Sequence, residues 1–293
     1  MLGEIFGPQK RIVISGCSYT EHSIWPKIIW PDAGRITNLA RSGAGNTYIA
    51  DSIIYQRDPG NPDLFSVDPR DPPDFVYIMF SGINRSDTVV PVCDDMQEYA
   101  NRHGFFSRID DSIYLFSGGH RGRYNPVFVR NYNNIRDPSW PEISGFSDWI
   151  NLPDNIKKEC VERNLFEYSP RSLDQLIHGT WNTRYWPNST FLETETYRSV
   201  IKCLDFLTLH RIKYAFSFFY DVFNREYETV NSYGCLSRKH PLYSRIDWSK
   251  MITPFPFDLA LRHNHISSDG CHQTQDGQRL YADHVKSQLR AML

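Results

Sequence analysis

The stretch Arg11-Ile-Val-Ile-Ser-Gly16, followed by Cys17-Ser-Tyr-Thr20, decides the fold of this chain. A short β-branched run favours a strand, and the glycine at its end permits a tight turn. The residues after the glycine lead into a helix. This stretch therefore predicts a strand, a tight turn and a helix in direct succession.

A second unit of the same kind follows along the chain. Ile36–Ala40 has the pattern of a short strand, and a turn follows at Gly43–Asn46. The apolar residues that recur at helical spacing after this turn are Tyr48, Ile49 and Ile53. We therefore expect a second strand and a second helix.

The third predicted strand is Phe75–Phe80, which is apolar throughout, as a strand buried on both faces should be. Before it, the stretch Pro59–Asp74 contains five prolines. Proline removes a backbone donor and fixes its backbone angle, so we expect no regular structure in that stretch.

The carboxy-terminal part continues the alternation of helices and strands. Ile212–Phe219 predicts a strand, and Thr274 is placed to cap a final helix. The helical stripe before the strand is Tyr197, Val200, Ile201, Leu204 and Leu207, and the stripe of the final helix is Tyr281, Val285, Leu289 and Met292. Alternating strands and helices predict an α/β fold with a parallel, doubly wound sheet.

Residues 85–190 interrupt this alternation. The region is rich in Gly, Pro, Asn, Arg and aromatic residues and has little sustained periodicity. We interpret it as a long irregular insertion within a single domain of residues 1–293. It is either a binding cap or an irregular subdomain that packs on the sheet.

The composition argues against a disordered or fibrous chain and against a protein that binds nucleic acid or membranes through its overall charge. The 293 residues are 40% hydrophobic and 23% charged, which is typical of a soluble globular chain. Lys and Arg total 32 against 34 Asp and Glu, so the formal charge of -2 provides no global field for nucleic acid or an anionic membrane. Any partner must therefore be recognised locally.

The sequence also bears on localisation. Met1–Lys10 contains no apolar run of signal-peptide length, and no later stretch approaches the roughly 20 apolar residues of a membrane span. The six cysteines are scattered, which fits thiols in a reducing compartment. We expect no secretion signal, no membrane span and cytoplasmic synthesis.

Polar residues with chemical potential follow the predicted strands. Ser18 follows the first strand, Gly43 the second and Asn84 the third, while Asp269 precedes His272 by three residues. In open parallel sheets ligands bind at the carboxyl ends of the strands, so these residues are candidates for one site. A serine nucleophile needs a base, and the base needs a partner that fixes its tautomer. We therefore predict Ser18 as the nucleophile, His272 as the base and Asp269 as its partner.

The same reasoning predicts an oxyanion hole. A tetrahedral intermediate carries a negative oxygen, which needs preorganised donors. The candidates are the backbone N–H groups of Ser18 and Gly43 and the side-chain amide of Asn84.

Four short blocks of this sequence resemble those of the SGNH or GDSL hydrolases, in that family's order. They are the nucleophile block Gly16–Thr20, the glycine block Asn38–Asn46, the Gly-x-Asn block Ser81–Asn84 and the Asp-x-x-His block Asp269–His272. The Gly-Cys-Ser form of the first block, with Trp25-Pro26 after it, is similar to a branch of the family with phage-encoded members.

The resemblance implies a three-layer α/β/α sandwich with a parallel sheet, which is SGNH-hydrolase-like and flavodoxin-like, and an ester hydrolase without cofactor or metal. It covers both ends of the chain and leaves the insertion outside. Two positions depart from the family pattern, because Cys17 replaces the usual Asp and Gln273 stands where proline commonly follows the histidine. Neither departure removes a group that performs chemistry.

Other patterns carry weaker alternatives. Thr20 stands where the α/β-hydrolase elbow has its second glycine, which disfavours that family. Cys17 is a second candidate nucleophile, but neighbouring residues that leave a strand point to different sides, so packing is favoured. A loose zinc set fits no standard spacing; it comprises His263, His265, Cys271 and His272.

Two features of the insertion also have structural explanations. The loop Gly118–Arg123 lacks the Walker lysine arrangement of a phosphate site and is more typical of a solvated loop. Four tryptophans are candidates for stacking on sugar rings, although core packing is the commoner fate of such rings; they are Trp140, Trp149, Trp181 and Trp186.

Together with the resemblance, these observations predict a serine esterase. Within what the resemblance implies, the aromatic-rich insertion favours removal of acetyl or short acyl groups from a carbohydrate, while other short-chain acyl esters and lipids stay open as substrates. Its partner would be a small ester or an acylated glycan, with no nucleic acid partner. The alternative is a virus-associated binding or structural protein that retains the hydrolase fold. Association with a virion or with further copies of the chain stays open.

Overall fold

The computed structural model describes residues 5–83, 85, 87–103, 106–116, 136–142, 153, 155–156, 159, 189–224, 235–267 and 272–292. Contacts divide the chain into two compact units, one formed by Met1–Gly118 with Ser189–Leu293 and the other by Gly119–Asn188. Every helix and strand described below belongs to the first unit.

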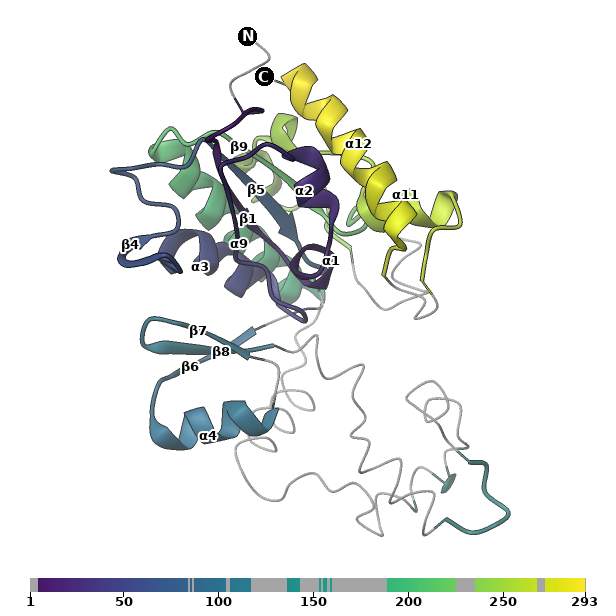
Figure 1. The fold of residues 1–293 in the computed structure, drawn as a ribbon. Coiled ribbons are helices and arrows are strands. Elements are labelled where there is room, and N and C mark those ends of the chain that lie inside the picture. Colours follow the sequence, from purple (N-terminus) through teal and green to yellow (C-terminus); the bar gives the residue numbers. More distant parts are fainter. Residues whose placement is uncertain are drawn as a thin grey trace. The chain divides into compact units, whose positions relative to one another are not determined.

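The centre of the first unit is a four-stranded parallel sheet with the strand order β2-β1-β5-β9 (Figure 1). Its strands are β1 (Arg11–Ser15), β2 (Arg35–Asn38), β5 (Phe75–Phe80) and β9 (Tyr214–Phe218). Every residue of β5 is buried, as its unbroken apolar pattern predicted. The structure thus confirms a parallel sheet within an α/β fold.

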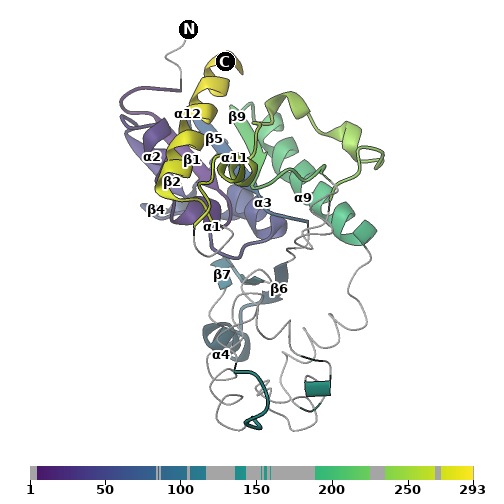
Figure 2. The same cartoon turned by 90° about the vertical axis from the view of Figure 1, so that its right-hand side faces the viewer.

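Helices separate the strands of this sheet along the chain. They form two groups, and within each group neighbouring helices contact one another (Figure 2). One group is α2 (Trp25–Ile29), α11 (Pro256–Arg262) and α12 (Gln275–Met292), and the other is α3 (Asn46–Tyr55) and α9 (Ser189–Leu209). A four-residue helix, α1 (Ser18–Glu21), directly follows β1, and the 3₁₀ turns Tyr243–Arg245 and Trp248–Lys250 follow β9.

Side chains that point to different faces of the sheet contact different helices. Tyr77 of β5 packs its ring against Trp25 of α2 and exchanges a hydrogen bond of 2.6 Å with the hydroxyl of Tyr281 in α12. Ser15 of β1 instead bonds the hydroxyl of Ser52 in α3 at 2.7 Å. Tyr77 pairs with Ile14, the residue before Ser15, and successive strand residues point to opposite faces, so Tyr77 and Ser15 point to opposite faces of the sheet.

The final helix begins where the sequence predicted. The hydroxyl of Thr274 accepts the backbone N–H of Gly277 at 3.3 Å, which caps the first turn of α12. Tyr281, Val285 and Leu289 on its apolar stripe are buried. None of the described helices combines the length and apolar character that a membrane crossing needs.

Part of the predicted irregular insertion proved regular. The described residues between 87 and 116 form an antiparallel sheet with the order β6-β8-β7, together with a helix. These elements are β6 (Asp87–Pro91), α4 (Asp94–His103), β7 (Phe106–Ile109) and β8 (Ser112–Phe116). β6 and β7, the outer strands of this sheet, mix polar residues or a proline with apolar ones, so no clear pattern marks them in the sequence. Pairing with β8 stabilises each one.

The expectation of no regular structure between Pro59 and Asp74 was also wrong. A short antiparallel hairpin pairs β3 (Arg57–Asp58) with β4 (Asn61–Phe65). Each strand has one neighbour in this two-stranded sheet, so Pro62 can lie in β4 although it lacks a donor.

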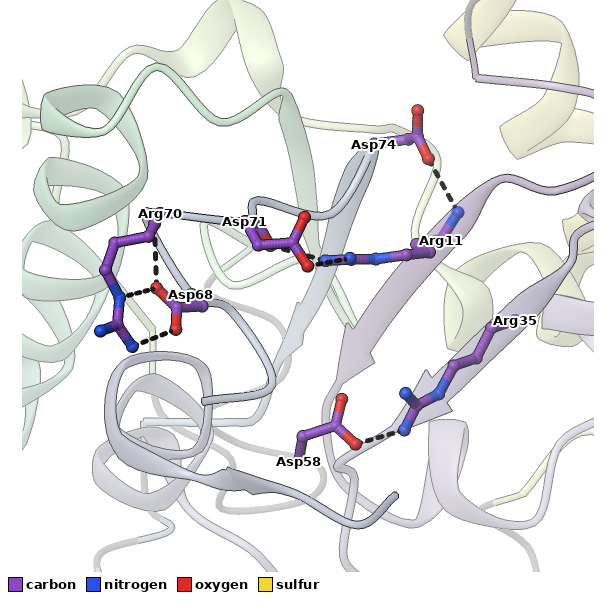
Figure 3. A network of polar contacts seen from close by, with 7 residues as sticks. All are labelled: Arg11, Arg35, Asp58, Asp68, Arg70, Asp71 and Asp74. Atoms are coloured by element: carbon purple, nitrogen blue, oxygen red, sulfur yellow. Dashed lines mark hydrogen bonds and ion pairs between the residues drawn. The ribbon is translucent and has the colours of Figure 1, made fainter. Parts of the chain in front are cut away.

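Ion pairs attach this hairpin and its following loop to the amino ends of the central strands (Figure 3). Arg11, the first residue of β1, pairs with Asp71 at 2.5 Å, and its backbone N–H donates to Asp74 at 2.8 Å. Arg35, the first residue of β2, pairs with Asp58 at 2.5 Å. The carboxyl ends of these strands, where a site is expected, lie at the opposite edge of the sheet.

Candidate active site

Ser18 lies just beyond the carboxyl end of β1. Gly16 makes the turn, since a Cβ there would lie 2.4 Å from the Thr20 hydroxyl oxygen. The carbonyl of Cys17 then accepts the N–H groups of Thr20 and Glu21 at 2.9 and 3.0 Å. The strand and this single helical turn therefore place Ser18 at the edge of the sheet, and the side chain of Cys17 is buried in the core.

His272 approaches Ser18 from the segment before α12. The backbone of this segment is fixed by an antiparallel bridge between Ile266 and Gln273, and the N–H of Ser267 donates to the carbonyl of His272 at 2.7 Å. The imidazole Nε2 of His272 lies 2.8 Å from the hydroxyl oxygen of Ser18, although the two residues are 254 positions apart.

This contact has the geometry that general-base catalysis requires. When the imidazole carries its proton on Nδ1, the Ser18 hydroxyl donates to the free Nε2. A base in that position can take the hydroxyl proton as the oxygen attacks a carbonyl.

The aromatic ring of Tyr19 lies beside the imidazole of His272. The ring of Tyr19 lies 5.3 Å from that of His272, measured between centroids, and 5.1 Å from that of Phe219. The indole N–H of Trp25 donates to the carbonyl of Tyr19 at 2.9 Å. The Tyr19 ring therefore lies beside the imidazole of His272, and Phe219 and Trp25 support Tyr19 in that position.

Gly43 belongs to the turn between β2 and α3, which runs beside the Ser18 turn. The N–H of Arg41 donates to the carbonyl of Gly16 at 3.0 Å, so the two turns leave neighbouring strands together. Gly43 has a φ of 83°, a left-handed conformation that favours glycine. The structure therefore brings Ser18, Gly43 and His272 to one edge of the sheet.

Asn84 and Asp269 lie outside the described residues, as do Cys271 and the loop Gly118–Arg123. The described residues contain no group of three or more His, Cys, Asp or Glu side chains that would hold a metal ion.

Of the candidate sugar-binding tryptophans, the structure describes Trp140. Trp149, Trp181 and Trp186 are not among the described residues. Trp140 is half-buried in a turn of residues 136–142, where its carbonyl accepts the Arg136 guanidinium at 2.7 Å.

Two carboxylates near the site were not predicted from the sequence. Glu21 in α1 accepts the backbone N–H of Ser42 at 2.5 Å. Asp87 at the start of β6 accepts the N–H groups of Gly45 and Tyr48, each at 2.7 Å. Glu21 could have been singled out from the sequence because it is an acidic residue one helical turn after the candidate nucleophile. Asp87 could not, because no local pattern connects it to a turn about 40 positions earlier.

Burial raises the pKa of Asp87 to about 7, and the nearby carboxylate of Asp51 acts in the same direction. The N–H groups of Tyr48 and Gly45 oppose this shift because they favour the ionised form. Asp87 is therefore mostly a carboxylate only above about pH 7.

No protein-family model matches this sequence, and a search of curated proteins found no match either.

Proposed function

We propose that this protein is a serine esterase in which Ser18 and His272 perform the chemistry. The observation that carries the proposal is the 2.8 Å contact between the Ser18 hydroxyl and His272 Nε2. Two residues 254 positions apart meet at the carboxyl end of the sheet, where open α/β proteins bind their ligands.

In the proposed reaction, Ser18 Oγ attacks the carbonyl carbon of the ester while His272 Nε2 takes the hydroxyl proton. The backbone N–H groups of Ser18 and Gly43, with the Asn84 amide, bind the oxyanion of the tetrahedral intermediate. His272 returns the proton to the leaving alcohol, and Asp269 supports the imidazolium. Water then cleaves the acyl-enzyme by the same steps and releases the acid.

The proposed architecture is a three-layer α/β/α sandwich of the SGNH-hydrolase or flavodoxin-like kind. The strand order β2-β1-β5-β9 supports it, because chain order then reverses beside β1 and places a ligand crevice there. Contacts of Tyr77 with α12 and of Ser15 with α3 support a helical layer on each face.

The proposed substrate is an O-acetyl or short acyl ester on a carbohydrate. The support is compositional: residues 85–190 are rich in aromatic residues and arginine, and aromatic faces suit sugar rings. A small activated ester needs only the nucleophile, base and oxyanion donors, so it is the first substrate to test.

Covalent labelling with a fluorophosphonate tests the proposal. We expect one adduct per chain, and mass spectrometry should locate it on the peptide that contains Ser18. Ser18→Ala should abolish it, whereas Ser23→Ala is the matched control, because the Ser23 hydroxyl donates to the carbonyl of Tyr19 instead.

A folded wild-type protein that takes up no label, and turns over no activated ester, would contradict the proposal. It would favour a virus-associated binding or structural protein that retains the fold.

A further inference from the structure

In the turn from Ser42 to Gly45, every backbone N–H group except one donates a hydrogen bond within the described part of the chain. The N–H of Ser42 donates to Glu21 at 2.5 Å, that of Ala44 to the Arg41 carbonyl at 3.1 Å, and that of Gly45 to Asp87 at 2.7 Å. Within the described part of the chain, the Gly43 N–H donates to no acceptor. It is therefore the donor of this turn left for a ligand.

The first anchor connects the turn to the nucleophile. Glu21 ends the four-residue helix that Ser18 begins, and its carboxylate reaches across to Ser42. The Asn38 side chain reinforces the link by donating to the carbonyls of Thr20 and Glu21 at 3.2 and 3.3 Å. The positions of Ser18 and Gly43 are therefore coupled through side chains as well as through the sheet.

The second anchor connects the turn to the segment that follows β5. Asp87 holds Gly45 and also Tyr48, two donors at the start of α3 that have no partner within the helix. Asn46 adds a second link, because its side chain accepts the N–H of Ser81 at 2.7 Å and donates to the carbonyl of Ser81 at 3.3 Å.

We propose that Glu21 and Asp87 are positioning residues for the oxyanion hole, which hold the turn on both sides of Gly43 and so aim its N–H. A glycine at a φ of 83° has wide conformational freedom. Anchors at positions 42 and 45 restrict that freedom without occupying the Gly43 donor. Neither carboxylate touches the reacting atoms, so both act through the backbone.

The proposal depends on the esterase function proposed above. An oxyanion donor acts mainly in the transition state, so loss of an anchor should lower kcat and leave KM nearly unchanged. A displacement of about 1 Å can cost about 100-fold in rate, so we expect kcat to fall about 10- to 100-fold.

The experiment measures kcat and KM for a small activated ester with Glu21→Gln, Glu21→Ala and Asp87→Asn. Assays run at pH 8, where the wild-type Asp87 is mostly ionised, since its pKa is about 7. Gln keeps one acceptor oxygen and Ala none, so Glu21→Ala should lose more rate than Glu21→Gln.

The matched control is Asp58→Asn. Asp58 also accepts two backbone N–H groups, those of Gly60 and Asn61, but it pairs with Arg35 at the amino end of β2. This variant should lose stability without losing kcat.

The outcomes separate the two proposals. If the wild type turns over ester and the folded Glu21 and Asp87 variants keep its kcat, the positioning role is wrong and the esterase function stands. If the wild type neither takes up a fluorophosphonate nor turns over ester, both proposals fall. Should Asp87→Asn not fold, the graded pair at Glu21, a partly exposed side chain, decides the question.

Discussion

At the scale of single residues, the hydrogen bond between Ser18 and His272 is the main determinant of the proposed chemistry. Its geometry depends on Gly16, which permits the tight turn, and on Tyr19, whose ring lies beside the imidazole. Catalytic residues that act as a unit are not additive, so their variants should show a recognisable pattern.

Replacing Ser18 with alanine should reduce hydrolysis of an activated ester by about 1000-fold or more. His272→Ala should cost a similar factor, and the double variant should be no slower than the slower single variant, because each change removes the same catalytic unit. Steady-state kinetics test this, and thermal unfolding should show little change for Ser18→Ala. Losses that multiply in the double variant would show that the two residues act independently.

The ionisation of Asp68 should make the free energy of unfolding depend on pH. Hydrogen bonds from the Arg70 side chain and backbone N–H lower the pKa of this buried carboxyl to about 2 (Figure 3). Its pKa is thus lower in the folded chain than in the unfolded one. The ionised Asp68 therefore adds to the free energy of unfolding above about pH 4, and this contribution is lost as pH falls towards about 2.

Asp68→Asn should therefore reduce the free energy of unfolding by on the order of 1 kcal/mol at pH 6. The difference from the wild type should shrink as pH falls from about 4 to about 2, the range between the usual pKa and the lowered one. Urea unfolding at several pH values measures it. A difference that stays constant with pH would mean that the Asp68 ionisation does not contribute.

At the scale of elements, α12 joins the core to the site. Its apolar stripe packs in the core, and the segment before its first turn carries His272. Different contacts stabilise these two parts. The Thr274 cap supports the helix, whereas Ser267 and the bridge at Ile266 hold the His272 backbone.

Thr274→Ala should lower the free energy of unfolding by about 1 kcal/mol, the usual cost of losing a helix cap. Ester turnover at a temperature well below unfolding should stay within about twofold of the wild type, since a cap acts on stability. Urea titration and kinetics on the same sample check both. A large loss of kcat would place Thr274 among the residues that position His272.

At the scale of the whole molecule, the described hydrophobic core belongs to the first unit. Its buried residues come from positions 5–116 and 197–289, and none of the described residues between Gly119 and Asn188 is among them. A unit with its own core can fold alone.

We expect a variant with residues 119–188 replaced by a flexible Gly/Ser linker to unfold cooperatively and to label with a small fluorophosphonate at Ser18. If the removed region recognises sugars, the variant should lose acetyl release from a polysaccharide while it keeps turnover of a small activated ester. Absence of folded protein would show that residues 119–188 are needed for the first unit to fold.

Local sequence was sufficient for the central elements. Unbroken apolar runs predicted β1 and β5, helical stripes predicted α9 and α12, and Thr274 marked the start of α12. These features could be read because each depends on residues within one strand or a few helical turns. The positions of Ser18 and Gly43 after their strands, and of His272 before the final helix, also predicted that these three residues would share an edge of the sheet.

Only the tertiary structure decided the rest. The outer strands β6 and β7 mix polar residues or a proline with apolar ones and are stabilised by pairing with β8. In the β3-β4 hairpin, Pro62 lies in a strand with a single neighbour. The anchors at Glu21 and Asp87 bind backbone donors 21 and 42 positions away. No local pattern encodes such contacts, because they form only when packing of the sheet and helices brings distant backbone into hydrogen-bonding range.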